Sequence, residues 1–169
     1  MLASNKLRIF EKIINNINGI FNTVAAVMLF LLMVQGTADV VGRYLFNSPI
    51  IGTMERGQVL LALMVFLSWG YTQIKKGHVS VELFILKFPP RVRAVTNLAT
   101  TFLTFVFFVL IVWQATLAAM GTHKAGEVMY VIHWPLAPFQ LFVPIGAIFL
   151  CLVLILEMIQ YLHQIKEGV

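Results

Sequence analysis

The chain has 169 residues, of which 60% are hydrophobic and only 11% are charged. Its mean hydropathy is +0.90. Soluble domains carry about a quarter charged residues, so this sequence has too little polar surface to cover a globule of its size in water. The net charge of +5 comes from basic residues that lie between apolar runs, not from a basic face suited to nucleic acid. The composition therefore indicates an integral membrane protein.

The chain opens with an amphipathic segment, "LRIFEKIINNINGIFN". Apolar residues recur at helical spacing while charged residues and asparagines lie opposite; the apolar positions are Leu7, Phe10, Ile14, Ile17 and Phe21. No small-residue cleavage pattern follows at the distance expected for a signal peptide. We expect this segment to be retained as the lead-in to the first membrane span.

Four apolar segments are long enough to cross a bilayer, which takes about 20 residues of helix. They lie near residues 19–45, 55–75, 94–120 and 138–162. Isolated strands are excluded in lipid because their backbone groups would be unpaired. The predicted fold is an all-α integral membrane protein, with four transmembrane helices in a single domain over residues 1–169.

A shorter amphipathic stretch lies between the second and third spans, near residues 79–88. Val81, Phe84, Ile85 and Phe88 can share one helical face, and a stretch of this length fits along the membrane surface better than across it. Pro89 follows directly and disfavours further helix. The sequence thus predicts a short interfacial helix here.

The basic residues also predict the orientation. Nine of them fall in the N-terminal segment, the second connection and the C-terminal tail, which share one side of the membrane if the chain crosses four times. The other side has Arg43, Arg56 and Lys124. Since basic residues near helix ends favour the cytoplasm, both termini are predicted to be cytoplasmic.

Gln35, Asp39 and Arg43 follow one another at intervals of four in the first span, so they share a helix face. Ionisable residues inside a membrane often mark an ion or substrate path. A second interpretation is a neutralised Asp39–Arg43 pair near the outer interface, which holds this helix against a neighbour. We favour the pair because no charge lies at the middle of the helix.

The second span begins near Glu55, where the helix dipole favours a carboxylate. Gln58, Trp69 and Gln73 follow on one face. Amides on a lipid-facing surface would be costly, and interhelical hydrogen bonds satisfy them. We expect this face to pack against protein, either within the chain or in a partner.

No cofactor is expected in this chain. None of the four histidines lies in the middle of a span, where haem ligands would be needed, and no clustered ligand spacing suits zinc. No nucleophile–base pair, phosphate-binding loop or carboxylate pair appears, so no catalytic activity is expected.

Residues 39–84 resemble the small (Q, DctQ-like) membrane subunit of tripartite ATP-independent periplasmic (TRAP) transporters. The resemblance is carried by "RYLFNSP" after the first span, Glu55, "KKGHVSVEL" after the second span, and "VPIGA" in the fourth. The four-span plan agrees along nearly the whole chain. Arg56 and Gly57 depart from the pattern, which has a more acidic or apolar continuation after Glu55.

The resemblance implies a bacterial inner-membrane protein that braces a large, elevator-type membrane (M) subunit. A periplasmic substrate-binding (P) protein delivers an organic anion, a carboxylate or sulfonate, and sodium ions bind the large subunit. It also implies that Arg43 and Glu55 are polar fasteners on the periplasmic side, and that Trp69 and Gln73 belong to the intersubunit face. Contacts with lipid headgroups or the large subunit are expected at the cytoplasmic connection: Lys75, Lys76, His78, Lys87, Arg91 and Arg93.

Two other functions are weighed against this one. A self-sufficient small oligomeric transporter or channel would need a membrane-embedded acidic residue, and Glu157 is the one carboxylate well inside the last span. The second alternative is a membrane anchor subunit of a redox complex.

Overall fold

The computed structural model describes residues 2–75 and 90–167, and most of this part of the chain is helical. The helices are α1 (Leu2–Leu45), α2 (Thr53–Ile74), α4 (Pro90–Ala125), α5 (Ala137–Gln140) and α6 (Phe142–Glu167). Within the described ranges, four helical segments are long and apolar enough to cross a membrane, the number expected from the sequence. The interfacial helix predicted near residues 79–88 lies outside the described residues.

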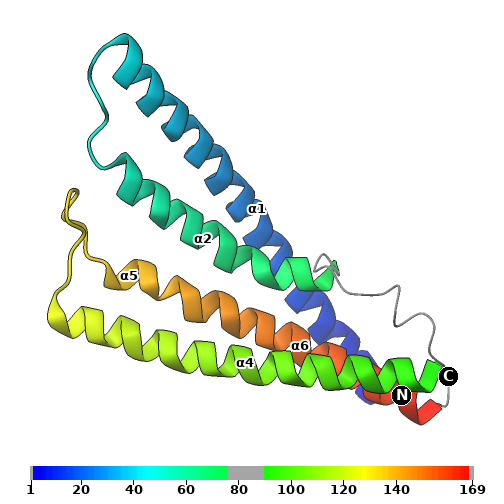
Figure 1. The fold of residues 1–169 in the computed structure, drawn as a ribbon. Coiled ribbons are helices and arrows are strands. Elements are labelled where there is room, and N and C mark those ends of the chain that lie inside the picture. The colour runs from blue at the N-terminus through cyan, green and yellow to red at the C-terminus, as the bar shows by residue number, and fades with distance from the viewer. Residues whose placement is uncertain (1, 76–89, 168–169) are drawn as a thin grey trace.

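The helices form two antiparallel pairs. α1 packs along α2, α4 packs along α6, and α2 also packs against α6. Figure 1 shows the two pairs close together at the end that carries the N- and C-termini, and diverging toward the opposite end. We call these the terminal end and the loop end; the loop end contains residues 46–52 and 126–136. The molecule is therefore a wedge that widens toward its loop end.

Two helices, α1 and α4, are much longer than the hydrocarbon core of a bilayer is thick. α1 has 44 residues and so extends about 66 Å at 1.5 Å per residue, against a hydrocarbon core of about 30 Å. The amphipathic lead-in and the first span form this one continuous helix. Such a helix crosses the membrane at a steep tilt or leaves it at one end, and Figure 1 shows α1 running obliquely to α4 and α6.

Four residues of the loop end have backbone in the left-handed region, and two of them lie in the loop between α1 and α2. Asn47 (φ 49°) follows α1, and Gly52 (φ 76°) directly precedes α2. Gly52 is also required by packing, because a Cβ at this position would lie 2.2 Å from Cγ2 of Ile132. The loop before α2 and the loop before α5 are thus in direct contact.

The predicted fourth span consists of two helices, with a break between Gln140 and Phe142. Pro144 explains the break: it has no N–H to donate to the carbonyl of Gln140, so a continuous helix would lose this bond. In the observed structure Pro144 lies in the first turn of α6, where a missing donor is tolerated.

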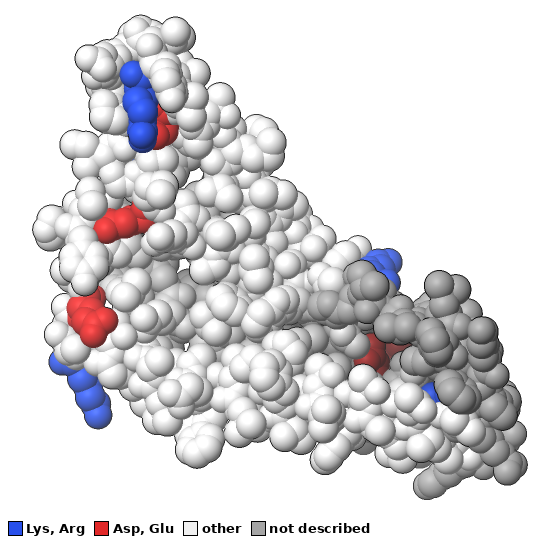
Figure 2. Space-filling view, in the orientation of Figure 1, with Lys and Arg blue, Asp and Glu red and all other residues white. Residues whose placement is uncertain are grey.

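The core lies where α1, α2 and α6 meet, and it includes Ile14, Val153 and Leu156 packed with Ile74 and Leu152. Elsewhere the helices present large apolar side chains to the outside, such as Phe30 (64% exposed) and Trp113 (65% exposed). Figure 2 shows charged side chains at the two ends and an uncharged surface between them on this face. This distribution suits a protein surrounded by lipid at mid-height.

Candidate functional site

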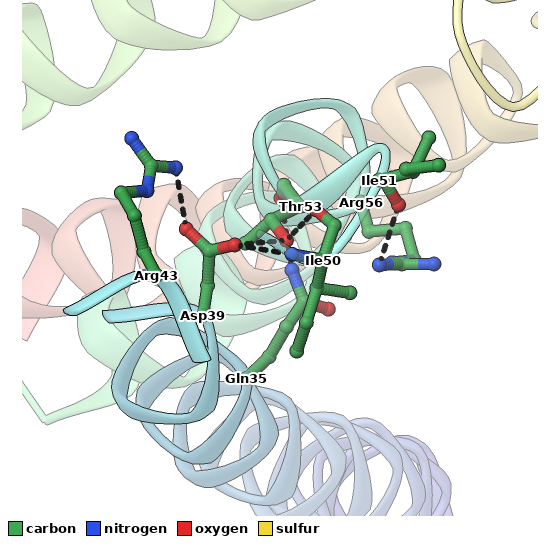
Figure 3. Close-up of polar contacts among 7 residues, drawn as sticks. All are labelled: Gln35, Asp39, Arg43, Ile50, Ile51, Thr53 and Arg56. Atoms are coloured by element: carbon green, nitrogen blue, oxygen red, sulfur yellow. Dashed lines mark hydrogen bonds and ion pairs between the residues drawn. The ribbon is translucent and has the colours of Figure 1, made fainter. Parts of the chain in front are cut away.

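Asp39 lies at the centre of a group of hydrogen bonds that connects α1 with the start of α2. We call this group the Asp39 joint. The residue is only 6% exposed. Oδ2 accepts a hydrogen bond from Nη2 of Arg43 at 2.7 Å, and Oδ1 accepts one from the backbone N–H of Ile50 at 2.9 Å. The predicted Asp39–Arg43 pair is therefore confirmed. Figure 3 shows that Asp39 also points toward the residues of the following loop.

Two further side chains complete this joint. Gln35 donates from Nε2 to the backbone carbonyl of Thr53 at 2.8 Å. The hydroxyl of Thr53 lies 2.7 Å from the carbonyl oxygen of Ile50 and 3.3 Å from Oδ1 of Asp39, and its single hydrogen serves one of them at a time. Gln35 and Asp39, one turn apart on α1, thus hold the first turn of α2 and the loop before it.

Arg56 fastens the same loop from its other side. Its Nη2 donates to the carbonyl oxygen of Ile51 at 2.9 Å, and Figure 3 shows it approaching the loop from α2. Arg56 departs from the sequence pattern of the small TRAP subunits, and the structure gives it a definite contact. The loop between α1 and α2 is therefore held by side chains from both helices.

Glu55 joins the two helix pairs at the loop end. Its carboxylate accepts hydrogen bonds from the backbone N–H of Val131, at 2.9 and 3.1 Å to the two oxygens, and from that of Ile132 at 3.0 Å. The loop it holds is itself ordered by backbone bonds from Met129 to Trp134 (2.9 Å) and from Leu136 to Glu127 (3.1 Å). Glu55 acts here as a fastener within the chain.

The polar face predicted for α2 divides into two kinds of residue. Trp69 packs edge-to-face against Phe66 (4.6 Å between ring centroids) and Phe108 (5.0 Å), and Gln73 donates to Glu157 of α6 at 2.8 Å. Gln58 is exposed. Trp69 and Gln73 therefore contribute to packing within the chain, whereas Gln58 is on the free surface.

The predicted cytoplasmic connection is described only at its two ends. Lys75 is exposed beside the ring of Tyr71, with Nζ 5.7 Å from the ring centroid, and Arg93 is exposed in the first turns of α4. Arg91 lies in α4, but its side chain is not among those described. Lys76, His78 and Lys87 lie outside the described residues.

Two polar residues, one of them buried and the other exposed, were not predicted as site residues. Asn18 is fully buried between helices, although it belongs to the amphipathic lead-in, where asparagines were assigned to the polar face. Gln114 is exposed on α4, roughly 16 Å from the end of that helix at 1.5 Å per residue. Its signal in the sequence was an amide inside an apolar run, at seven-residue intervals from Thr100, Phe107 and Gly121.

The hydrogen bonds described above connect helices and loops of the same chain. The polar side chains of Gln35, Asp39, Glu55 and Gln73 bond to other parts of the same chain. Within the described ranges, no three His, Cys, Asp or Glu residues are grouped so that they could hold a metal ion.

Comparison with known protein families identifies a match over most of the chain. The family model for the DctQ component of tripartite ATP-independent periplasmic transporters matches residues 32–164, which include the joint at Asp39, the Glu55 contact and the Gln73–Glu157 bond. A search of curated proteins gives no match.

Proposed function

Because the chain belongs to the family of DctQ components of tripartite ATP-independent periplasmic transporters, we propose that it braces the large membrane subunit of such a transporter. The family match makes it a small membrane subunit of a transport system. Its mechanical role is that of a fixed support. The chain stays in place in the bilayer while the large subunit carries an organic anion across by an elevator motion coupled to sodium.

The observation that best supports this proposal is that polar side chains of the spans form hydrogen bonds within the chain. The Asp39 joint, the Glu55 contact and the Gln73–Glu157 bond all tie the chain to itself. Ion and substrate pathways need polar groups that line a route across the membrane, and these groups are instead engaged in joints between helices. Such cross-linking suits a stiff support, since an elevator domain can move only relative to something that does not.

Gln114 supports a proposed contact between α4 and the large subunit. It lies on a face of α4 shared with Thr100, Phe107 and Gly121, all of them exposed. An exposed amide at this depth would face hydrocarbon, and a hydrogen bond to a neighbouring transmembrane helix removes that cost. Gln58, exposed on α2, is a second position of this kind. We assign both to contacts with the large subunit.

The remaining roles belong to other components. Sodium and the transported anion, a carboxylate or sulfonate, bind in the large subunit, and a periplasmic protein delivers the anion. The chain lies in the bacterial inner membrane with its terminal end toward the cytoplasm and its loop end toward the periplasm.

Reconstitution tests the proposal directly. Proteoliposomes with this chain, the large subunit and the binding protein are expected to take up the anion in a sodium gradient, and omission of this chain is expected to abolish uptake. Uptake by liposomes that contain this chain alone would refute a supporting role and favour the self-sufficient transporter. Haem absorption in the purified chain would favour the redox anchor.

A further inference from the structure

Near the terminal end, the two helices of one pair, α1 and α2, make an unusually close contact at Asn18. This residue is 0% exposed, and its Nδ2 donates to the carbonyl of Ile14 at 2.9 Å. Its Oδ1 is buried without a hydrogen-bond partner and lies over Gly70 of α2, where a Cβ would be 1.9 Å from it. Only glycine at position 70 admits the asparagine, so α1 and α2 are fixed at this point.

A second close contact lies one helical turn away on α2. The backbone carbonyl of Phe66 faces Gly146 of α6, and a Cβ on Gly146 would be 2.2 Å from that oxygen. Small residues at helix crossings allow such backbone approach in membranes. The Phe66–Gly146 contact therefore fixes the point at which the two pairs cross, one turn of α2 away from the position where Asn18 fixes α1.

Beyond this crossing the pairs diverge toward the loop end (Figure 1). Among the described residues, the hydrogen bonds that join the two pairs at the loop end all run to the Glu55 carboxylate, from Val131 and Ile132. Beside them, Gly52 contacts the side chain of Ile132. One carboxylate thus bridges the wide end of the wedge.

We propose that Glu55 is a tie that sets the separation of the two helix pairs at the loop end, with the Phe66–Gly146 contact as the pivot between the pairs and the Asn18–Gly70 contact holding α1 to α2. The pivot determines where the pairs cross, and the tie determines how far they open. This inference concerns the chain by itself and holds whether or not the proposed bracing role is correct.

The chemistry of the contact explains why the tie is a carboxylate. Both oxygens of Glu55 lie within hydrogen-bond distance of backbone N–H groups, and an ionised carboxylate offers acceptors on both. A glutamine would offer one acceptor oxygen and turn its amide hydrogens toward the other donor. The tie should therefore be strongest with glutamate at position 55, weaker with glutamine and weakest with alanine.

Distance measurements between spin labels test this proposal in the full chain reconstituted in lipid nanodiscs. Cys151→Ala removes the native thiol. One label pair, Tyr44→Cys and Lys124→Cys, spans the loop end, and another, Ile9→Cys and Val92→Cys, spans the terminal end; all four positions are exposed. We expect Glu55→Ala to broaden the loop-end distances and extend them to longer values, Glu55→Gln to do so less, and the terminal-end distances to stay unchanged.

Glu127→Ala is the matched control, since it removes an exposed carboxylate from the loop that Glu55 holds; its distances should equal those of the parent. Unchanged loop-end distances in Glu55→Ala would overturn the proposal. If Glu55→Ala disturbs both label pairs, Glu55→Asp decides, because its shorter side chain keeps the charge but does not reach the loop. A change of the loop-end distances alone then supports the tie, and no change, or a change at both ends, overturns it.

Discussion

Gln73 of α2 and Glu157 of α6 are joined by a 2.8 Å hydrogen bond from amide Nε2 to carboxylate Oε2, across 84 residues of sequence. Glu157 is the acidic residue that a self-sufficient transporter in this chain would depend on. In the structure it accepts a bond from a neighbouring helix, close to the point where α1, α2 and α6 converge. Its place is that of a packing residue between helices.

The Gln73–Glu157 bond should contribute measurably to stability. Replacing Gln73 with Leu removes the donor, and interhelical hydrogen bonds in membrane proteins are each worth on the order of 1 kcal/mol. We expect the free energy of unfolding, measured by SDS titration in mixed micelles, to fall by about that amount. Gln58→Leu is the control: it makes the same chemical change on the same helix at an exposed position and should leave the stability of the isolated chain unchanged.

The two partners of the Asp39–Arg43 pair should contribute unequally. The Arg43 side chain is 58% exposed and the Asp39 side chain 9% exposed, and exposed ion pairs add little stability. Asp39 also accepts from the Ile50 backbone, so its loss leaves a loop donor unpaired. Asp39→Ala is expected to lower the melting temperature clearly more than Arg43→Ala. Equal losses would mean that the ion pair, rather than the loop contact, holds this end.

The close approach of α2 and α6 predicts a strong effect at Gly146. Gly146→Ala places a methyl group against the Phe66 carbonyl, which is backbone and cannot rotate away, and overpacking of this kind costs about 1–3 kcal/mol. Gly121→Ala makes the same substitution on α4, where a Cβ meets nothing within 4 Å. Its unfolding free energy should stay within about 0.5 kcal/mol of the parent, and a comparable loss in both variants would contradict the close contact.

Much of the fold followed from the sequence because hydrophobicity in a membrane protein is a local signal. The predicted spans near 55–75 and 94–120 became Thr53–Ile74 and Pro90–Ala125, and the Asp39–Arg43 pair followed from four-residue spacing on one helix. The structure differs from the prediction in two places: one helix continues through the lead-in, and the fourth span is broken before Phe142. These differences change the lengths of helices but not the type of fold.

The partners of the polar residues could not be predicted in the same way. Glu55 bonds to a loop 76 residues away, and Asp39 bonds to Ile50 through a turn that contains left-handed backbone at Asn47. Asn18 was assigned to the polar side of an amphipathic helix, yet the other helices cover it. Such contacts depend on how helices cross, and periodicity within one helix carries no information on this.

The proposed contact of α4 with the large subunit predicts a loss that appears only in the complex. Gln114→Leu should leave the unfolding free energy of the isolated chain unchanged, since the side chain is exposed, but it should reduce the amount of large subunit that co-purifies. Met120→Leu, at a position that is 55% exposed on the same helix, is the control and should retain the partner. Full retention of the large subunit by Gln114→Leu would remove this residue from the interface.

The orientation of the wedge is open to chemical labelling in intact cells. With Cys151→Ala as background, Tyr130→Cys places a thiol at a residue that is 94% exposed in the loop before α5, and Lys75→Cys places one at the exposed end of α2. Nine basic residues on the side of the terminal end favour the cytoplasm for that side. A membrane-impermeant maleimide applied from the periplasm should therefore label Tyr130→Cys at once and Lys75→Cys only after the inner membrane is permeabilised. The reverse pattern would place the Glu55 tie on the cytoplasmic side, away from any periplasmic binding protein.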